Sequence, residues 1–325
     1  MPPSVSVALA TFNGEQFIAE QLESILAQTW TPDEVIVADD GSTDRTLDIV
    51  RKVHAAHRGP AVALRILESD KRLGVAKNFE RALLAASSEL IALSDQDDRW
   101  HPDKLARSVP SFEADARLLL QHSNARLVDA EGKPLGLSLF EALYLTNFER
   151  DLIGAGRAFD AYVRRNLVTG ATAMVRRRLL DSAVPFPEGW IHDEWLAVVA
   201  AAVGDIQLLD EQLVDYRQHG ANVIGVKAPT LRYRVRRMLE PRGDRYRDLR
   251  SRSILLLDRL ERVGAKSAAL NRARDKVRFE SNREKLSPWR LFRISTVLAE
   301  RRRGSYENLS SQGNLDVLRD ILQPR

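Results

Sequence analysis

Short apolar runs alternate with segments of helical periodicity over the first hundred residues of the chain. The runs are rich in β-branched residues and end in polar turns, which is typical of buried strands. Between them, apolar residues recur every three or four positions, as on one face of a helix. Because strands that alternate with helices form parallel sheets, the pattern predicts an α/β fold with helices on both faces of the sheet. The predicted strands are 4–9, 34–38, 62–67 and 90–93, and the predicted helices are 17–26, 47–53 and 74–86.

The pattern is less regular further along the chain. An amphipathic helix is expected to begin at Asp193, with Leu196, Val199 and Val203 on its apolar face. Residues 141–165 contain no motif and receive no assignment. Strand-like runs fall at 118–122, 125–129, 168–177, 206–209 and 213–216. Apolar stripes flanked by arginines, within 231–239, 249–263 and 291–298, predict basic helices.

Composition adds two constraints. The chain has 325 residues, is 44% hydrophobic and 29% charged, and contains no cysteine, which excludes disulfides and thiolate chemistry. It has no apolar run of about 18 residues and no signal-peptide pattern near its first residue, so we expect a cytoplasmic protein. Charge divides it unevenly: residues 226–325 carry 26 lysines and arginines against 12 acids, and the rest carry 23 against 33. The split predicts two regions, 1–225 and 226–325.

Acidic loops follow the predicted strands. Thr11, Asp40 and Asp95 fall where parallel strands end, which is the edge at which α/β sheets bind ligands. Asp95, Asp97 and Asp98 crowd three carboxylates together, and hard cations such as Mg²⁺ or Mn²⁺ accept such ligands. The alternative is an acidic loop that caps the next helix. The chain has neither a Gly-x-Gly-x-x-Gly after its first strand nor a P-loop, so a phosphate-bearing ligand would need a bridging metal.

Four segments, in this order and spacing, resemble the family 2 glycosyltransferases: Val7–Gly14, Gln28–Trp30, Val37–Asp44 and Asp95–Asp98. The resemblance covers about residues 4–225. It implies the GT-A fold, in which a mostly parallel, Rossmann-like sheet is flanked by helices. The nucleotide-binding half would span about 1–115 and the acceptor-binding half about 116–225, with an additional helical region over 226–325.

The resemblance also implies roles in the nucleotide-binding half. Asp40 would accept the imide N–H of a uracil or thymine, and Asp95 and Asp97 would meet the ribose and the metal. Asp98 would support them, and Asp39 and Asp44 are expected to cap turns. Thr43 is a candidate N-cap for the helix that follows it. The nucleotide and donor would further contact Ala10, Thr11, Phe12, Asn13 and Gln96.

The remaining roles come from later segments. Gly170 would let the backbone approach the donor sugar, although a plain buried strand explains this stretch as well. Residues 192–193 read His-Asp where the family usually has Glu-Asp, which resembles the bacterial rhamnosyltransferase-like branch. Asp193 would be the general base, or merely a helix cap, with Trp190 and His192 beside the acceptor. In a closing loop that includes Gly220 and Gly225, Arg217 would neutralise phosphate charge, and His219 would complete the metal shell or touch the diphosphate.

Together these features predict a metal-dependent inverting transfer from a UDP- or dTDP-sugar, with dTDP-rhamnose as one candidate, to a cell-surface glycan or lipid-linked acceptor. A hydrolase with two carboxylates and a catalytically inactive membrane scaffold are the alternatives. The basic C-terminal region would bind an anionic membrane surface, at the inner face of the cytoplasmic membrane, or pack on the catalytic domain. Nucleic-acid binding is disfavoured because aromatics are sparse and no binding module is recognisable. The oligomeric state is left open.

Overall fold

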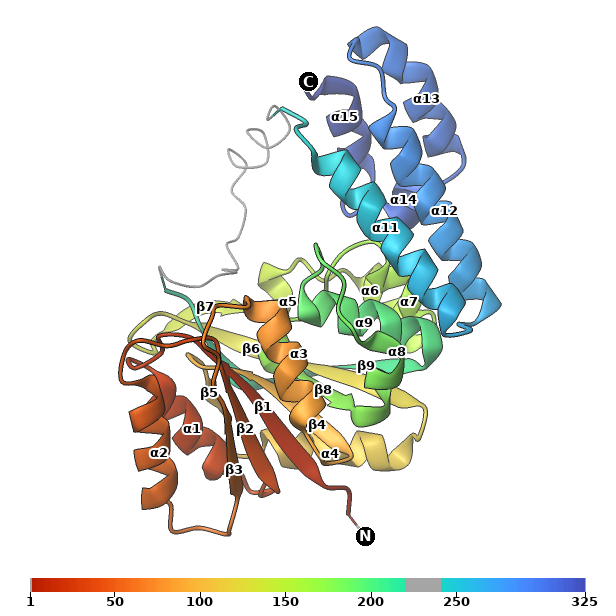
Figure 1. The fold of residues 1–325 in the computed structure, drawn as a ribbon. Coiled ribbons are helices and arrows are strands. Elements are labelled where there is room, and N and C mark those ends of the chain that lie inside the picture. The colour runs from red at the N-terminus through yellow and green to blue at the C-terminus, as the bar shows by residue number, and fades with distance from the viewer. Residues whose placement is uncertain (1, 220–240, 325) are drawn as a thin grey trace.

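The computed structural model describes residues 2–219 and 241–324 (Figure 1). Its centre is a mixed sheet of order β3-β2-β1-β4-β8-β6-β9-β5, with β7 paired to β6. Strands β1 to β4 are parallel, which confirms the first four predicted strands, whereas β8 is antiparallel to β4 and β6. The strands are β1 (Val5–Thr11), β2 (Glu34–Asp39), β3 (Ala63–Leu67), β4 (Leu90–Asp95), β5 (Arg99–Trp100), β6 (Leu118–Val128), β7 (Pro134–Ser138), β8 (Ala173–Arg176) and β9 (Asp205–Arg217).

Helices cover both faces of the sheet, as the alternating pattern predicts. Because side chains alternate along a strand, Val7 and Leu9 of β1 face one core and Ala8 faces the other. The first core is closed by α1 (Ile18–Leu26), α2 (Thr46–Ala56) and α4 (Lys104–Ala114). The second is closed by α3 (Val75–Ala85) and α9 (His192–Val203).

Helix α9 differs from its prediction. Ten of its 12 residues are buried, so it is enclosed on all sides rather than amphipathic. The small residues Ala197, Ala200 and Ala201 allow this, because helices packed on several sides need close approach. The helix begins at His192, so the expected start at Asp193 is one residue late.

Two pairs of predicted strands are in fact single long strands. The runs 118–122 and 125–129 join in β6, and 206–209 and 213–216 join in β9. The polar residues between the first pair, Ser123 and Asn124, lie at an irregularity of the β6–β9 ladder, where Asn124 Oδ1 accepts from Phe140 N at 3.0 Å. In the predicted strand 168–177, residues Gly170–Thr172 form a 3₁₀ turn before β8 begins.

Local capping also decides the ends of helices. Thr43 is not an N-cap, because α2 begins at Thr46, whose N–H donates to Asp44 Oδ1 at 3.0 Å. Three short helices lie in and just before the unassigned segment 141–165, and the first two begin with capping boxes, at Ser138 and Thr146. These helices are α5 (Leu139–Ala142), α6 (Asn147–Gly154) and α7 (Ala158–Tyr162).

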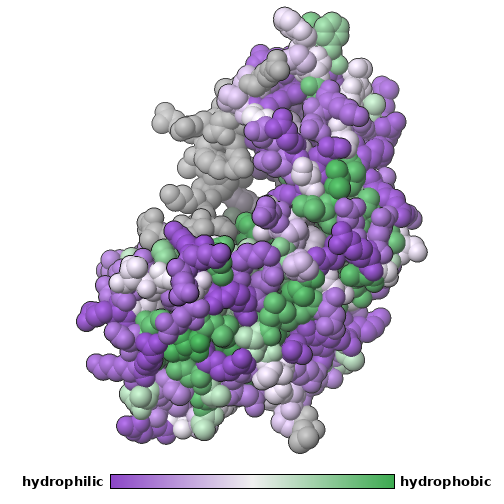
Figure 2. All heavy atoms as spheres, viewed as in Figure 1, coloured by the Kyte–Doolittle hydropathy of each residue, from purple (hydrophilic) through white to green (hydrophobic). Residues whose placement is uncertain are grey.

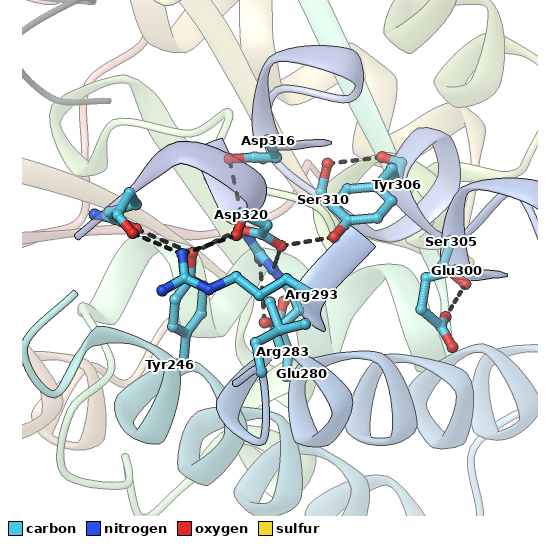
Figure 3. A network of polar contacts seen from close by, with 12 residues as sticks. Tyr246, Glu280, Arg283, Arg293, Glu300, Ser305, Tyr306, Ser310, Asp316 and Asp320 are labelled. Carbon is cyan, nitrogen blue, oxygen red and sulfur yellow. Dashed lines mark hydrogen bonds and ion pairs between the residues drawn. The ribbon is translucent and has the colours of Figure 1, made fainter. Parts of the chain in front are cut away.

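The C-terminal helices pack on the sheet domain. Leu256 of α11 and Ala269 of α12 lie in the same buried core as Leu196 of α9, so the docked-bundle alternative is confirmed for these two helices. Helix α12 has no strong apolar stripe, and the sequence pattern did not predict it. Beyond it, a buried polar network joins α11 to the last helices (Figure 3). The helices are α11 (Arg245–Arg262), α12 (Ser267–Glu284), α13 (Arg290–Arg302), α14 (Ser305–Leu309) and α15 (Asn314–Leu322).

Some predicted features lie outside the described residues, namely the apolar stripe within 231–239, Gly220, Gly225 and the region boundary at 225. Within 2–219 and 241–324, no helix combines the length and the apolar character that crossing a bilayer requires.

Candidate active site

The loop after β1 is held by side chains from the loops after β2 and β4. Gln96 Oε1 accepts from Phe12 N at 2.8 Å, and Gln96 Nε2 donates to Phe12 O at 3.0 Å. Asn13, in the left-handed region with φ 46°, accepts the N–H of Thr43 at 2.9 Å. The parallel strands thus bring the predicted nucleotide-binding residues to one rim, and their contact with a nucleotide stays a prediction. The residues of this rim are Ala10, Thr11, Phe12, Asn13 and Gln96.

Two consecutive aspartates at the end of β2 have different surroundings. Asp39 accepts from Thr11 Oγ1 at 2.8 Å and from Ser42 N at 2.7 Å, which is the turn-bracing role expected of it. Asp40 accepts from the backbone N–H of Leu73 at 2.6 Å and of Gly74 at 2.9 Å. Each Asp40 oxygen retains a second lone pair, so the predicted contact with a base stays open to test.

Four carboxylates converge where β4 ends and α9 begins. Burial, and then the charges of Asp97 and Asp193, raise the pKa of Asp95 to about 8. Asp98 is fully buried, and burial together with the charges of Asp97 and Asp95 raises its pKa well above the usual range. The fold therefore joins the three aspartates after β4 to Asp193, about a hundred positions later in the chain.

A buried lysine, which the sequence analysis missed, lies beside these acids. Lys104 is 1% exposed, donates to Ala171 O at 2.8 Å and has its Nζ 3.5 Å from the centre of the Trp100 ring. Its charge favours the ionised forms of Asp95 and Asp98, while burial lowers the pKa of Lys104 itself. A lysine at a helix start is ordinarily solvated, and only the tertiary structure shows that this one is not.

The end of β9 is hydrogen-bonded to the loop that contains Asp97 and Asp98. Arg217 N donates to Asp98 Oδ1 at 2.9 Å, and its guanidinium reaches Asp97 O at 2.8 Å and Glu20 Oε2 at 2.6 Å. Two residues later, His219 Nε2 lies 2.8 Å from Asp97 Oδ2. The ring of Phe17 packs against both side chains. Arg217 thus positions the loop, and its predicted contact with phosphate is untested.

These residues fit a divalent cation. Asp97 and His219, the two predicted ligands, already contact each other, and a carboxylate paired with an imidazole suits Mn²⁺ better than Mg²⁺. Asp98 Oδ2 is buried without a hydrogen-bond partner among the described residues. In the described part of the chain no three His, Asp or Glu side chains form a ligand group. Solvent and a diphosphate would therefore complete the shell, as is common for such ions.

Asp193 is buried in the first turn of α9 and is not its N-cap residue, and its role as the base stays a prediction. The N-cap of α9 is Ile191, and Asp193 lies in the first turn. Its carboxylate accepts from Gly170 N at 3.0 Å, from Asn166 Nδ2 at 3.2 Å and from Glu194 N at 2.6 Å. Burial raises the pKa of Asp193 to about 6 despite these hydrogen bonds, so it is ionised at neutral pH yet still able to take a proton. Asn166, which the sequence analysis did not single out, follows directly after the unassigned segment 141–165.

The neighbours of Asp193 are built into the protein interior. His192 is buried and stacks on Phe79 with 4.0 Å between ring centres, and burial lowers its pKa to about 3, so it is neutral. A Cβ at Gly170 would lie 2.5 Å from His192 Nε2, so this glycine makes room for the histidine. Trp190 is partly buried and stacks against the guanidinium of Arg252 at 4.2 Å. A predicted acceptor contact by Trp190 or His192 is untested.

The fold and site define an α/β protein in which four aspartates gather at one edge of the central sheet. The model of Glycosyl transferase family 2 matches residues 6–182, more than half of the chain, and the chain belongs to this family. An uncharacterized glycosyltransferase of Nostoc sp. is 28% identical over 222 residues, covering 67% of this chain and 66% of that protein. The dTDP-rhamnosyl transferase RfbG of Shigella flexneri is 38% identical over 105 residues, 31% of this chain and 35% of that protein. The chain thus spans less than two thirds of the length of these relatives.

Two solved structures share the fold. TarS of S. aureus, solved in complex with UDP-GlcNAc, superimposes with a TM-score of 0.59 at 20% identity, over 98% of this chain and 90% of that one. The mannosyltransferase PcManGT from Pyrobaculum calidifontis, solved with GDP-Man and Mn²⁺, gives a TM-score of 0.52 at 20% identity, over 99% and 87%. The GT-A-like α/β fold with a C-terminal helical region is therefore confirmed.

Proposed function

We propose that the protein is a metal-dependent inverting glycosyltransferase that uses a UDP- or dTDP-sugar. The observation that carries this proposal is the convergence of the buried Asp193, the proposed base, with Asp95 and Asp97, the proposed contacts of the ribose and the metal. The His192–Asp193 pair and the partial likeness to RfbG support dTDP-rhamnose as the donor. The acceptor is a hydroxyl of a cell-surface glycan or of a lipid-linked saccharide.

The proposed reaction needs one base and one displacement. Asp193 takes the proton of the acceptor hydroxyl while that oxygen bonds to the anomeric carbon of the donor. The bond from this carbon to the β-phosphate oxygen breaks, and its electron pair leaves with the nucleoside diphosphate. Attack from the face opposite the leaving group inverts the anomeric centre. A bound cation supplies positive charge to the leaving diphosphate. Asp97 and His219 would hold that cation.

The test combines donor binding with turnover. Thermal shift of the full chain is measured with UDP, dTDP and GDP, and with UDP- and dTDP-sugars, each with Mn²⁺ or EDTA. We expect the shift from uridine or thymidine diphosphates to need Mn²⁺ and to disappear in Asp97→Asn. Asp103→Asn, at an exposed aspartate six positions later, is the matched control. Full transfer in EDTA would refute the metal role, and donor binding without any transfer would favour the inactive scaffold.

A further inference from the structure

Helix α13 has polar residues on its buried side and apolar residues on its exposed side, the reverse of an ordinary surface helix. Its buried side consists of Arg293, Val297 and Glu300, whereas its outward side carries apolar residues. Three side chains at its start are exposed, Trp289 at 71%, Leu291 at 80% and Phe292 at 72%. Ile294 at 37% and Leu298 at 38% continue the outward stripe, because residues three and seven positions apart share a helix face. We call these five residues the α13 apolar face.

The inversion is built into the fold by polar contacts. Arg293 donates to Ser287 O at 2.6 Å, to Pro288 O at 2.8 Å and to Gln323 O at 2.6 Å. Glu300 accepts from Ser305 Oγ at 2.6 Å. Figure 3 shows this polar interior. Since these inward contacts fix the rotation of the helix about its axis, the apolar side has no core to face.

Helix α15, which packs against α13, also has buried polar residues and exposed apolar residues. Its two acids, Asp316 and Asp320, are fully buried, and Asp320 accepts from Arg283 and Tyr246. Its leucines at 315, 318 and 322 are between 40% and 47% exposed and share one face. Figure 1 places α13 and α15 farthest from the sheet, and Figure 2 shows apolar atoms at the tip where α13 begins. Single exposed leucines need no explanation, but two inverted helices indicate an interaction surface.

The charged residues of α13 favour a lipid surface over a second copy of the chain as the partner. The exposed charged residues of α13 are Arg290, Arg301 and Arg302, and its one acid, Glu300, is buried. The surface is therefore apolar and positive only. A second copy of the same surface would place arginines against arginines, whereas anionic lipid headgroups complement them and the acyl region accepts the apolar face. Tryptophan, here Trp289, is also enriched at the bilayer–water boundary.

We propose that the α13 apolar face inserts into the surface of an anionic lipid bilayer, with the arginines against the headgroups. Such insertion uses only side chains that are already exposed, so it needs no unfolding of the C-terminal helices. The proposal holds whether or not the proposed sugar transfer is correct, because none of these residues belongs to the candidate active site.

The experiment is flotation of the purified full chain with vesicles of phosphatidylcholine, with and without phosphatidylglycerol. We expect the chain to float with the anionic vesicles, less so as salt is raised. Leu291→Ser with Phe292→Ser should weaken partitioning at least about tenfold, because two large apolar side chains lose their burial. Replacing Arg301 and Arg302 by glutamine should weaken it about fivefold for each arginine.

Leu84→Ser is the matched control, since this leucine of α3 is 52% exposed and lies outside the C-terminal helices. It should float like the unaltered chain. All variants should keep the Tm and the donor-induced thermal shift of the unaltered chain, which separates this test from that of sugar transfer. The proposal is overturned by equal binding to neutral vesicles, by full flotation of the Leu291–Phe292 variant, or by a dimer that this variant dissociates.

Discussion

Replacing Asp193 by asparagine removes the proposed base with almost no change of shape. The raised pKa of about 6 means that burying the ionised carboxylate costs about 3 kcal/mol of folding free energy at neutral pH, at about 1.4 kcal/mol per pKa unit. Asparagine avoids this cost. It keeps an oxygen for the N–H of Glu194 and the amide of Asn166, but its NH₂ would face the N–H of Gly170. That lost hydrogen bond costs about 1–3 kcal/mol.

The free energy gained by removing the buried charge and the free energy lost with the hydrogen bond from Gly170 nearly cancel. Asp193→Asn should therefore unfold within a few degrees of the unaltered protein at pH 7. The sign of the pH dependence follows from the direction of the pKa shift. The stability of the unaltered protein relative to the variant is greatest near pH 4 and is lost as pH rises through about 6. Thermal melts of both proteins at pH 5 and pH 8 measure this change in their relative stability.

Turnover should behave differently from stability. General-base catalysis contributes about 10²–10⁴-fold, so kcat of Asp193→Asn should fall by that factor while donor binding persists. In the unaltered enzyme kcat/KM should rise with pH and level off above about 6, because only the ionised carboxylate accepts a proton. Glu194→Gln, at the next residue, should keep most turnover. The reasoning is refuted if Asp193→Asn turns over normally, or if it loses stability and activity together as a mere helix cap would.

Three further substitutions probe the surroundings of the site. Gly170→Ala should lower stability by about 1–3 kcal/mol, because its Cβ would lie 2.5 Å from His192 Nε2. The loss of stability should be smaller in a His192→Ala background. An unchanged Tm for Gly170→Ala would contradict this contact. Lys104→Met should cost more in urea unfolding at pH 9 than at pH 7, because Asp95, with a pKa of about 8, is mostly ionised only at the higher pH and then lacks its neighbouring cation; an equal loss at both pH values would contradict this. Arg252→Ala removes the guanidinium that packs on the Trp190 ring at 4.2 Å, so kcat should fall while donor affinity holds; loss of donor affinity would argue against a local role.

Much of the nucleotide-binding half could be predicted from the sequence. Its strands are continuous apolar runs that end in polar loops, and each helix between them has one apolar face, so periodicity alone sets their order. Parallel strands bring their carboxyl ends to one edge, which is why the sequence alone groups the loops at Thr11, Asp40 and Asp95. The acid-rich stretch from Asp95 to Asp98 could be identified because its chemistry is local.

Other features depend on contacts between residues far apart in the chain. Nothing near Lys104 in the sequence indicates that it is buried against Ala171 and Asp98, and nothing near Gly170 indicates that His192 requires the space beside it. Helix α9 appeared amphipathic because the sequence does not reveal that α7 and α11 also pack on it.

The sequence by itself determined the alternating elements, the placement of the acids at one edge of the sheet and the basic character of the last hundred residues. Only the tertiary structure decided which acids interact, which arginines are buried and which face of α13 is exposed. The physical reason is that periodicity records burial against immediate neighbours, whereas a pKa, a buried ion pair or the rotation of a helix about its axis depends on groups that only folding brings together.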